Sequence, residues 1–179
     1  MDRKAQLAAS REASGYTSTD PAPPQDVGGG LEAAADKAAR AKPSVAELRG
    51  RLLDRSLPMF QRMRAVFSLR NRGGAEAIEA LAAAFDDPSA LLRHELAYVL
   101  GQMGDPHAVP FLTAVLRKGH EHVMVRHECA EALGAIGQPE SVPVLQQYLK
   151  DPNPEVSESC EVALDLIAWV NSKDLHYAA

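Results

Sequence analysis

The chain has 179 residues, 46% of them apolar and 5% aromatic, which is enough for one domain with a buried core. Its formal net charge of −5 argues against a nucleic-acid interface, because phosphate binding needs clustered Lys and Arg. No stretch approaches the roughly 20 apolar residues of a membrane span and no signal peptide is evident, so we expect a soluble, cytoplasmic protein.

Residues 1–43 are dominated by Ala, Gly, Pro, Ser and charged side chains, including Pro21-Ala22-Pro23-Pro24 and Gly28-Gly29-Gly30. They carry no sustained apolar face, so they cannot bury enough surface to offset the entropy that is lost on ordering. We predict that this segment is a disordered leader or linker.

From Ser44 onward the chain repeats itself. Leu69, Leu100, Leu133 and Leu166 are spaced by 31, 33 and 33 residues, and each unit consists of a helix, a short turn and a second helix. We predict an all-α fold in which residues 44–179 form a short α-solenoid, an α-α superhelix of four HEAT-like helix pairs. The predicted repeats cover about 44–73, 74–104, 105–137 and 138–171.

The second unit shows how the helices are delimited. Asp86-Asp87-Pro88 breaks its first helix, and Gly104-Asp105-Pro106 ends its second. The second helix carries Leu92, Leu96, Val99 and Met103 along one apolar stripe. Cys129 and Cys160 fall inside similar helical patterns, so we expect reduced core thiols and no disulfide.

One position of the repeat differs between inner and outer units. It reads Met63-Arg64, His94-Glu95, His127-Glu128 and Cys160-Glu161. If the fold itself needed a histidine at this position, the outer units would carry one too. The two His-Glu pairs are therefore interpreted as functional, and Cys160 as a small apolar core residue.

Helical geometry predicts where these side chains point. His94 lies about 160° from the centre of the apolar stripe of its helix, so we expect it to face away from the core, as His127 does in its own helix. Neighbouring helices pack at roughly 8 to 10 Å, so both imidazoles can converge on one metal ion. Each Glu points about 100° to one side, so one leans into the gap between the histidines and the other leans away.

Other residues on the same face are candidates for substrate binding. Gly101 and Gly134 lie seven residues after the histidines, and each costs roughly 1 kcal/mol relative to Ala in a helix. This cost makes sense if a long substrate side chain passes close to an exposed backbone. Tyr98 and Glu131, one turn after the histidines, either position a substrate amine or are simply solvated.

Two histidines with one or two carboxylates are typical of non-haem iron that activates dioxygen, although zinc remains possible. No HExxH or CxxC motif is present to support a zinc protease or a zinc finger. His120, Glu121 and His122 are interpreted as a polar turn between helices.

Residues 89–102 and 124–136 resemble the two His-Glu helices of deoxyhypusine hydroxylase. Supporting matches are residues 16–24, similar to the linker between the halves of that enzyme, and residues 67–71 and 158–165. The resemblance runs from Tyr16 to about Trp169 and points to the C-terminal half of the family.

The resemblance implies a HEAT-repeat di-iron monooxygenase. Such enzymes use dioxygen to hydroxylate the deoxyhypusine side chain of a translation initiation factor, which completes hypusine biosynthesis. By position, His94, His127 and Glu128 would bind one non-haem iron. Glu95 would be the catalytic residue that faces the substrate amine, or lie beside the metal; which Glu ligates iron stays open.

The family is similar to two facing four-repeat halves, each of which supplies the ligands of one iron, and this chain resembles one half. We therefore expect a fragment, a shortened variant, or a half-enzyme that pairs with another copy or with an N-terminal half. The alternatives are a metal-free HEAT scaffold whose groove binds a peptide or a partner helix, and a bilin lyase, since similar repeats occur there.

Overall fold

The computed structural model describes residues 43–172, so the predicted leader lies outside the described residues except for Pro43, as does the matched segment 16–24. Residues 43–172 contain eight α-helices, two short 3-10 helices and no strand, which confirms the all-α class. None of the helices in this range combines the length and apolar character needed to cross a membrane.

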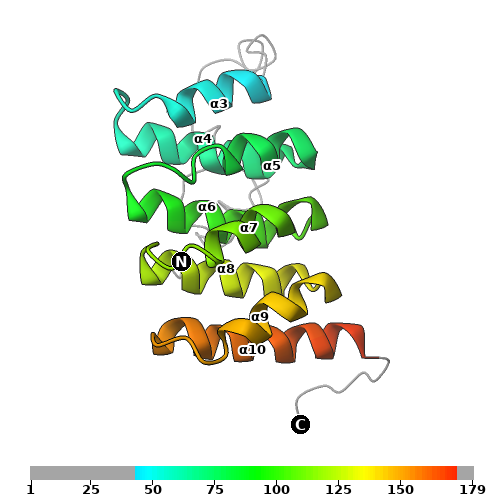
Figure 1. The fold of residues 1–179 in the computed structure, drawn as a ribbon. Coiled ribbons are helices and arrows are strands. Elements are labelled where there is room, and N and C mark those ends of the chain that lie inside the picture. The colour runs from blue at the N-terminus through cyan, green and yellow to red at the C-terminus, as the bar shows by residue number, and fades with distance from the viewer. Residues whose placement is uncertain (1–42, 173–179) are drawn as a thin grey trace, which may run out of the picture. The chain divides into compact units, whose positions relative to one another are not determined.

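The α-helices form pairs that stack into a solenoid (Figure 1). In each pair the second helix packs against the second helix of the next pair, so that α4, α6, α8 and α10 form one layer. The pairs are α3 (Val45–Leu53) with α4 (Met59–Arg72), α5 (Gly74–Ala82) with α6 (Ala90–Met103), α7 (Val109–Leu116) with α8 (Val123–Ile136), and α9 (Val142–Tyr148) with α10 (Pro154–Asn171). The 3-10 helices η1 (Pro106–Ala108) and η2 (Pro139–Ser141) precede α7 and α9.

Local sequence sets the ends of the two helices that carry His-Glu pairs. The Ser89 hydroxyl accepts a hydrogen bond from the backbone N–H of Leu92 at the start of α6. The His122 imidazole accepts one from Met124 at the start of α8. Gly104 and Gly137 end these helices with φ values of 63° and 76°, a left-handed conformation that favours glycine.

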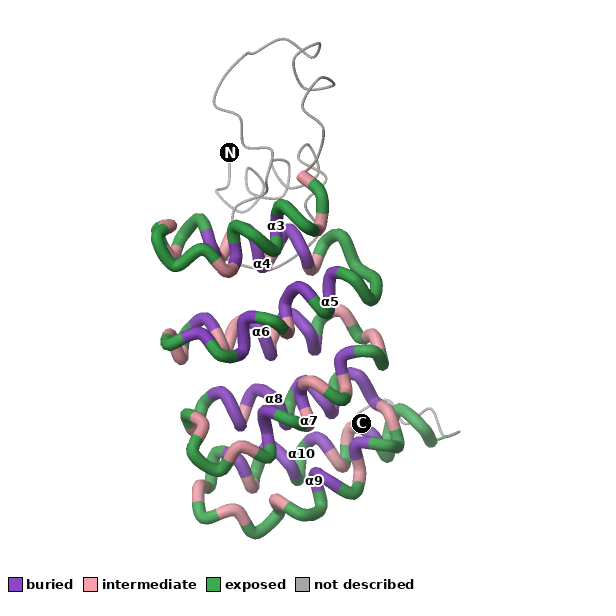
Figure 2. The backbone as a smooth tube through the Cα atoms, turned by 45° about the horizontal axis from the view of Figure 1, so that its top comes forward, coloured by how far each residue is buried: buried purple, intermediate pink, exposed green. Residues whose placement is uncertain are grey.

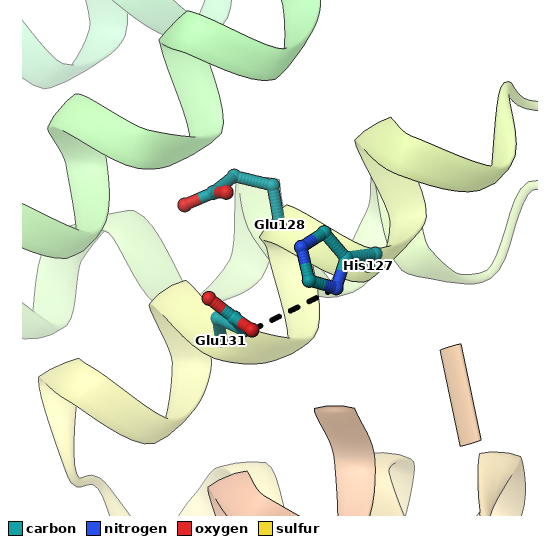
Figure 3. Close-up of side chains that lie close together, drawn as sticks. All are labelled: His127, Glu128 and Glu131. Carbon is teal, nitrogen blue, oxygen red and sulfur yellow. Dashed lines mark ion pairs between the residues drawn. The ribbon is translucent and has the colours of Figure 1, made fainter. Parts of the chain in front are cut away.

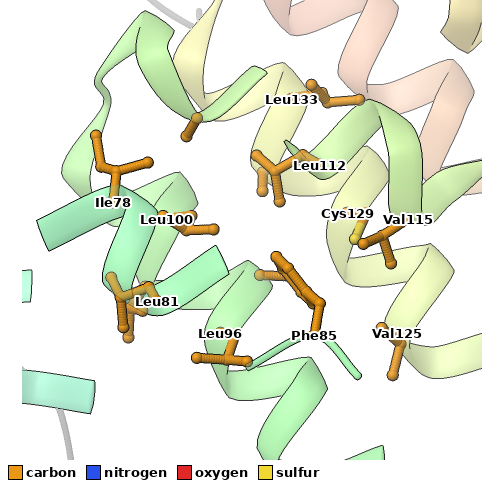
Figure 4. Close-up of a cluster of buried hydrophobic side chains, with 14 of the residues drawn as sticks. Ile78, Leu81, Phe85, Leu96, Leu100, Leu112, Val115, Val125, Cys129 and Leu133 are labelled. Carbon is orange, nitrogen blue, oxygen red and sulfur yellow. The ribbon is translucent and has the colours of Figure 1, made fainter. Parts of the chain in front are cut away.

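The core runs along the solenoid between the two helical layers (Figure 2). Side chains from α5, α6, α7 and α8 interdigitate there, among them Ile78, Leu100, Leu112 and Leu133 (Figure 4). No single pair could bury its own apolar stripe, so each repeat depends on its neighbours.

Cys129 and Cys160 are both buried and free, as predicted. Burial raises the pKa of the Cys129 thiol well above its usual value, so this thiol is unreactive.

Arginines one residue before the His-Glu position join successive repeats, a feature that the sequence analysis missed. Each guanidinium donates both to a backbone carbonyl oxygen that precedes its own helix in the same repeat and to an acidic side chain of a following loop. Their partners are Leu52 and Asp87 for Arg62, Asp87 and Glu121 for Arg93, and Leu116 and Asp151 for Arg126. The recurrence of Arg at these matched positions was the available signal in the sequence.

Candidate functional site

The two His-Glu pairs lie where α6 and α8 pack side by side. The His94 and His127 side chains are 29% and 21% exposed, so they belong neither to the core nor to the open surface. The prediction that they face away from the core is correct. The neighbouring second helix, however, covers much of that face, and the site is a seam between helices.

Across this seam His94 meets the carboxylate of the next repeat. Its Nε2 lies 3.1 Å from Oε2 of Glu128, and its Nδ1 lies 3.6 Å from Oε1 of Glu95. Glu128 thus leans towards α6, whereas Glu95 lies beside its own histidine, so the two carboxylates occupy unequal positions. The Nδ1 atom of His94 is buried and has no hydrogen-bond partner within residues 43–172.

Three side chains of α8 lie close enough to hold one ion. Ligand atoms of His127, Glu128 and Glu131 all lie within 4.8 Å of one another (Figure 3). Glu131 follows His127 by one helical turn, and its Oε1 lies 3.7 Å from Nδ1 of His127. His94 is outside this group, although it reaches Glu128. From the sequence, Glu131 was expected either to position a substrate amine or to be solvated. The structure adds it to the candidate ligands.

Glu128 has an unusual proton affinity. Burial, together with the neighbouring carboxylates of Glu131 and Glu95, raises its pKa to about 7, and the charge of His127 only partly offsets this effect. Without a cation, the seam therefore holds a proton on this carboxyl near neutral pH. A metal ion would replace that proton.

The residues present fit a divalent metal. Ligands on a small divalent ion lie about 2 Å from the metal, so two ligands are separated by about 4 Å or less. The ligand atoms of the α8 group lie within 4.8 Å of one another, so small side-chain rotations would bring them to that spacing. The donors are imidazole nitrogens and carboxylate oxygens, which suit iron or zinc. The buried Nδ1 of His94, without a hydrogen bond, and the raised pKa of Glu128 both indicate that the described side chains alone do not satisfy the site.

The expectation that Gly101 and Gly134 leave an exposed backbone beside the site is wrong. Gly101 and Gly134 are buried, and a Cβ atom on them would lie 2.9 Å and 2.7 Å from the Cα atoms of Ala132 and Ala163. They lie on the side of the helix that carries the histidines, as expected, but this side is covered by the next helix. Their absent side chains allow α6 to approach α8, and α8 to approach α10, closely.

The remaining candidates behave differently from one another. Tyr98 is half-buried and packs against the core. Glu121 lies in the loop before α8 and pairs with Arg93, and His122 caps α8, so both have structural roles, as expected of a polar turn. His120 lines a loop-side hollow of about 230 Å³ together with Arg93, Lys118 and Glu121.

Ser159 is a neighbour of the site that the sequence analysis did not single out. Its Oγ lies 2.6 Å from Nδ1 of His127, and it belongs to α10, the next second helix. The first three repeats carry Arg at the matching position, so the change to Ser in the fourth was the signal.

Exposed apolar side chains form a row beside the seam. Phe60, Leu91 and Met124 are 60%, 59% and 39% exposed, and each precedes the His-Glu position of its repeat by three residues. Because α4, α6 and α8 are adjacent, these side chains follow one another across the layer. We call them the apolar row.

The repeats match a known family. HEAT repeats match the chain over residues 45–124 and 79–165. Two deoxyhypusine hydroxylases, from Eremothecium gossypii and Candida glabrata, are 47% and 54% identical to it over 163 residues. These alignments cover 91% of this chain and 47% of each relative, so the chain spans about half the length of the curated relatives that it matches.

Solved structures agree. Human deoxyhypusine hydroxylase in complex with glycerol superimposes with a TM-score of 0.73 and 44% identity over 92% of this chain and 54% of that one. The complex of CpcE and CpcF of phycocyanin lyase from Nostoc gives 0.56 and 25% identity over 70% of this chain and 53% of that chain. The resemblance to deoxyhypusine hydroxylase that was stated from the His-Glu helices is confirmed.

Proposed function

The chain belongs to the HEAT-repeat family, and on this premise we propose that it is one half of an iron-dependent deoxyhypusine monooxygenase. The proposed reaction uses dioxygen to hydroxylate the deoxyhypusine side chain of a translation initiation factor, and the proposed place of action is the cytoplasm. The observation that carries the proposal is the meeting of the two His-Glu pairs at one seam, with His94 and Glu128 3.1 Å apart.

His94, His127 and Glu128 are the proposed iron ligands, and Glu131 is a fourth candidate. Iron would supply the electrons that activate dioxygen, which side chains alone cannot do. The raised pKa of Glu128 means that this carboxyl gives up its proton when the metal enters. Glu95, 3.6 Å from Nδ1 of His94, either orients that imidazole or ligates the metal itself.

The cationic amine of the substrate would meet carboxylates beside the metal. The Glu131 side chain is 49% exposed and lies at the mouth of the seam, so it can contact an entering ammonium group. Glu95, with a side chain 24% exposed, is the proposed catalytic residue that positions the substrate amine. Tyr98 is half-buried one turn further along α6, where its ring can border the substrate path.

The complete di-iron site would need a second half. This chain is about half as long as the relatives that it matches, and its proposed ligands are enough for one ion. We therefore propose that activity requires either an N-terminal half or another copy of this chain.

Metal content tests the proposal. The purified chain is loaded with Fe²⁺ without oxygen, desalted and analysed for iron per chain, alongside His94→Ala, His127→Ala and Glu128→Ala. His107→Ala is the matched control, because His107 is exposed, pairs with Glu79 and lies outside the seam. We expect the three site variants to lose iron and the control to keep it. Unchanged iron in both histidine variants would eliminate the proposal.

A non-catalytic scaffold is the second candidate function, and the apolar row favours it. Exposed apolar side chains at matched positions of neighbouring helices are typical of a protein-binding surface. Binding of the purified translation factor separates the two functions. A scaffold keeps its affinity for the factor in His94→Ala and His127→Ala and loses this affinity in Leu91→Ser. A monooxygenase half, in contrast, loses iron and activity in the two histidine variants.

A further inference from the structure

Ser159 departs from the pattern set by the other repeats. The first three repeats carry Arg62, Arg93 and Arg126 at this position, and each guanidinium is held by a carbonyl oxygen and an acidic side chain. Among residues 43–172, Ser159 makes neither contact. Its hydroxyl instead meets the imidazole of the preceding repeat, with 2.6 Å between Oγ and Nδ1 of His127.

The surroundings of Ser159 fix this contact. Ser159 is only 5% exposed, so water cannot easily replace the hydroxyl. Close packing of α8 on α10 brings it within reach, because Gly134 leaves room for the backbone of Ala163, one turn after Ser159. Glu131 also approaches the same nitrogen, but at 3.7 Å its carboxylate is beyond hydrogen-bond distance.

The other histidine of the site provides an internal comparison. The residue that matches Ser159 in the repeat next to His94 is Arg126, whose guanidinium is held by Leu116 and Asp151. Nδ1 of His94 accordingly has no hydrogen-bond partner within the described part of the chain, and its Nε2 faces Glu128. The two histidines are therefore held in different ways, although they occupy equivalent positions.

The hydrogen bond at one ring nitrogen of His127 decides whether the other ring nitrogen can bind a metal. A neutral imidazole carries one N–H donor and one acceptor nitrogen, and the partner of one nitrogen fixes the role of the other. If Nδ1–H donates to Oγ of Ser159, the lone pair of Nε2 is left for a ligand. Metal-binding histidines are commonly oriented by such a hydrogen bond.

We propose that Ser159 is a positioning residue that holds His127 through Nδ1 and thereby presents Nε2 to the metal. This inference rests on the proposed function, since it takes His127 to be a metal ligand. In the metal-free chain, the hydrogen bond with Ser159 alone selects the tautomer of His127.

The test measures that tautomer without metal. Long-range proton–nitrogen correlation spectra of the ¹⁵N-labelled chain, recorded where the imidazole is neutral, report which ring nitrogen carries the proton. The His127 signal is identified by its loss in His127→Gln. We expect the Nδ1–H form of His127 in the unaltered chain and in Ser159→Thr, and a shift towards Nε2–H in Ser159→Ala. Ser157 lies in the same helix, and its hydroxyl donates to the carbonyl oxygen of Pro154. Ser157→Ala is therefore the control and should leave the His127 signal unchanged.

Metal affinity provides the second readout. Ser159→Ala is expected to bind Fe²⁺ or Co²⁺ about 10- to 100-fold more weakly than the unaltered chain, and Ser159→Thr close to normally. The variant replaces Ser by the best helix former, so it is expected to stay folded, which thermal unfolding verifies. An unchanged His127 tautomer or unchanged affinity in Ser159→Ala would overturn the proposal.

The two proposals can fail separately. If the unaltered chain binds no metal but Ser159→Ala still shifts the tautomer, the proposed function fails and the orienting hydrogen bond is supported. If metal binds through His127 equally well with and without the Ser159 hydroxyl, the proposed function stands and the positioning role is lost.

Discussion

His94 in α6 and Glu128 in α8 meet across the seam between two repeats, with 3.1 Å between Nε2 and Oε2. The two residues are 34 positions apart in the chain, and only the stacking of second helices brings them together. The contact links the two His-Glu pairs into one site and places a carboxyl with a pKa of about 7 at its centre.

Stability should depend on pH through Glu128. Its pKa is about 7 in the folded chain and 4.5 when unperturbed, so the folded state holds this proton more tightly. The resulting stabilisation is fully present below pH 4.5 and is lost as the pH rises through 7. We expect the metal-free chain to lose about 2 kcal/mol of unfolding free energy from this group between pH 5 and 8, after allowance for solvent screening.

Urea unfolding at several pH values measures this loss. Glu128→Gln, which mimics the protonated carboxyl, should flatten the pH dependence, and the exposed Glu140→Gln should not. Equal slopes for Glu128→Gln and the unaltered chain would show that Glu128 does not hold this proton.

Metal affinity should also rise with pH. A metal must displace the Glu128 proton, so the apparent affinity for Fe²⁺ falls about tenfold for each pH unit below 7. Anaerobic titrations of the chain between pH 5.5 and 8 check this expectation. A pH-independent affinity would mean that Glu128 is not a ligand.

Replacement by alanine should destabilise the chain at Gly101 and Gly134, which lie between packed helices, and stabilise it at Gly50, which does not. Gly134→Ala and Gly101→Ala place a Cβ within 3 Å of the Ala163 and Ala132 backbones, so the helices must separate, at a cost of about 1 to 3 kcal/mol. Gly50→Ala, in α3 with nothing within 4 Å of its Cβ, should instead stabilise the chain by about 1 kcal/mol. Chemical denaturation distinguishes these signs, and stabilisation by Gly134→Ala would refute the packing role.

The buried Arg126–Asp151 pair should contribute strongly to stability. Burial alone would raise the pKa of Asp151, but the hydrogen bond and charge of Arg126, together with hydrogen bonds from Asn153, outweigh burial and lower this pKa. Arg126→Met leaves a buried, unpaired carboxylate, with an expected cost of about 3 to 5 kcal/mol. Thermal unfolding measures the loss, with the exposed Arg117→Ala as the control. A loss no larger than that of the control would mean that the pair contributes little.

Catalysis should require a second half. We expect hydroxylation of the protein substrate by this chain to be negligible at low concentration, and to rise steeply with chain concentration or on addition of an N-terminal half from a relative. Substrate turnover measured against native mass checks this. High activity from a proven monomer would contradict the half-site proposal.

The sequence by itself determined the repeat and the positions at which the inner repeats differ from the outer ones. The spacing of Leu69, Leu100, Leu133 and Leu166 records a helix pair that cannot bury its own apolar stripe, so a stacked solenoid follows from hydrophobic periodicity alone. The contrast between inner and outer units singled out His94 and His127, because the outer units form the same helix pair without a histidine. These inferences depend only on positions along a helix.

Tertiary structure decided what each face meets. Helical geometry places Gly101 on the same side as His94, but cannot reveal that the next helix covers this side and needs the missing side chain for its own approach. The recurring Arg and its replacement by Ser159 are visible in the sequence, but the contact of Ser159 with His127 and the ion pairs of Arg62 and Arg126 are not. A sequence gives the angle of a side chain about its own helix, whereas contacts and burial depend on the distance and rotation of the neighbouring helix, which only packing sets.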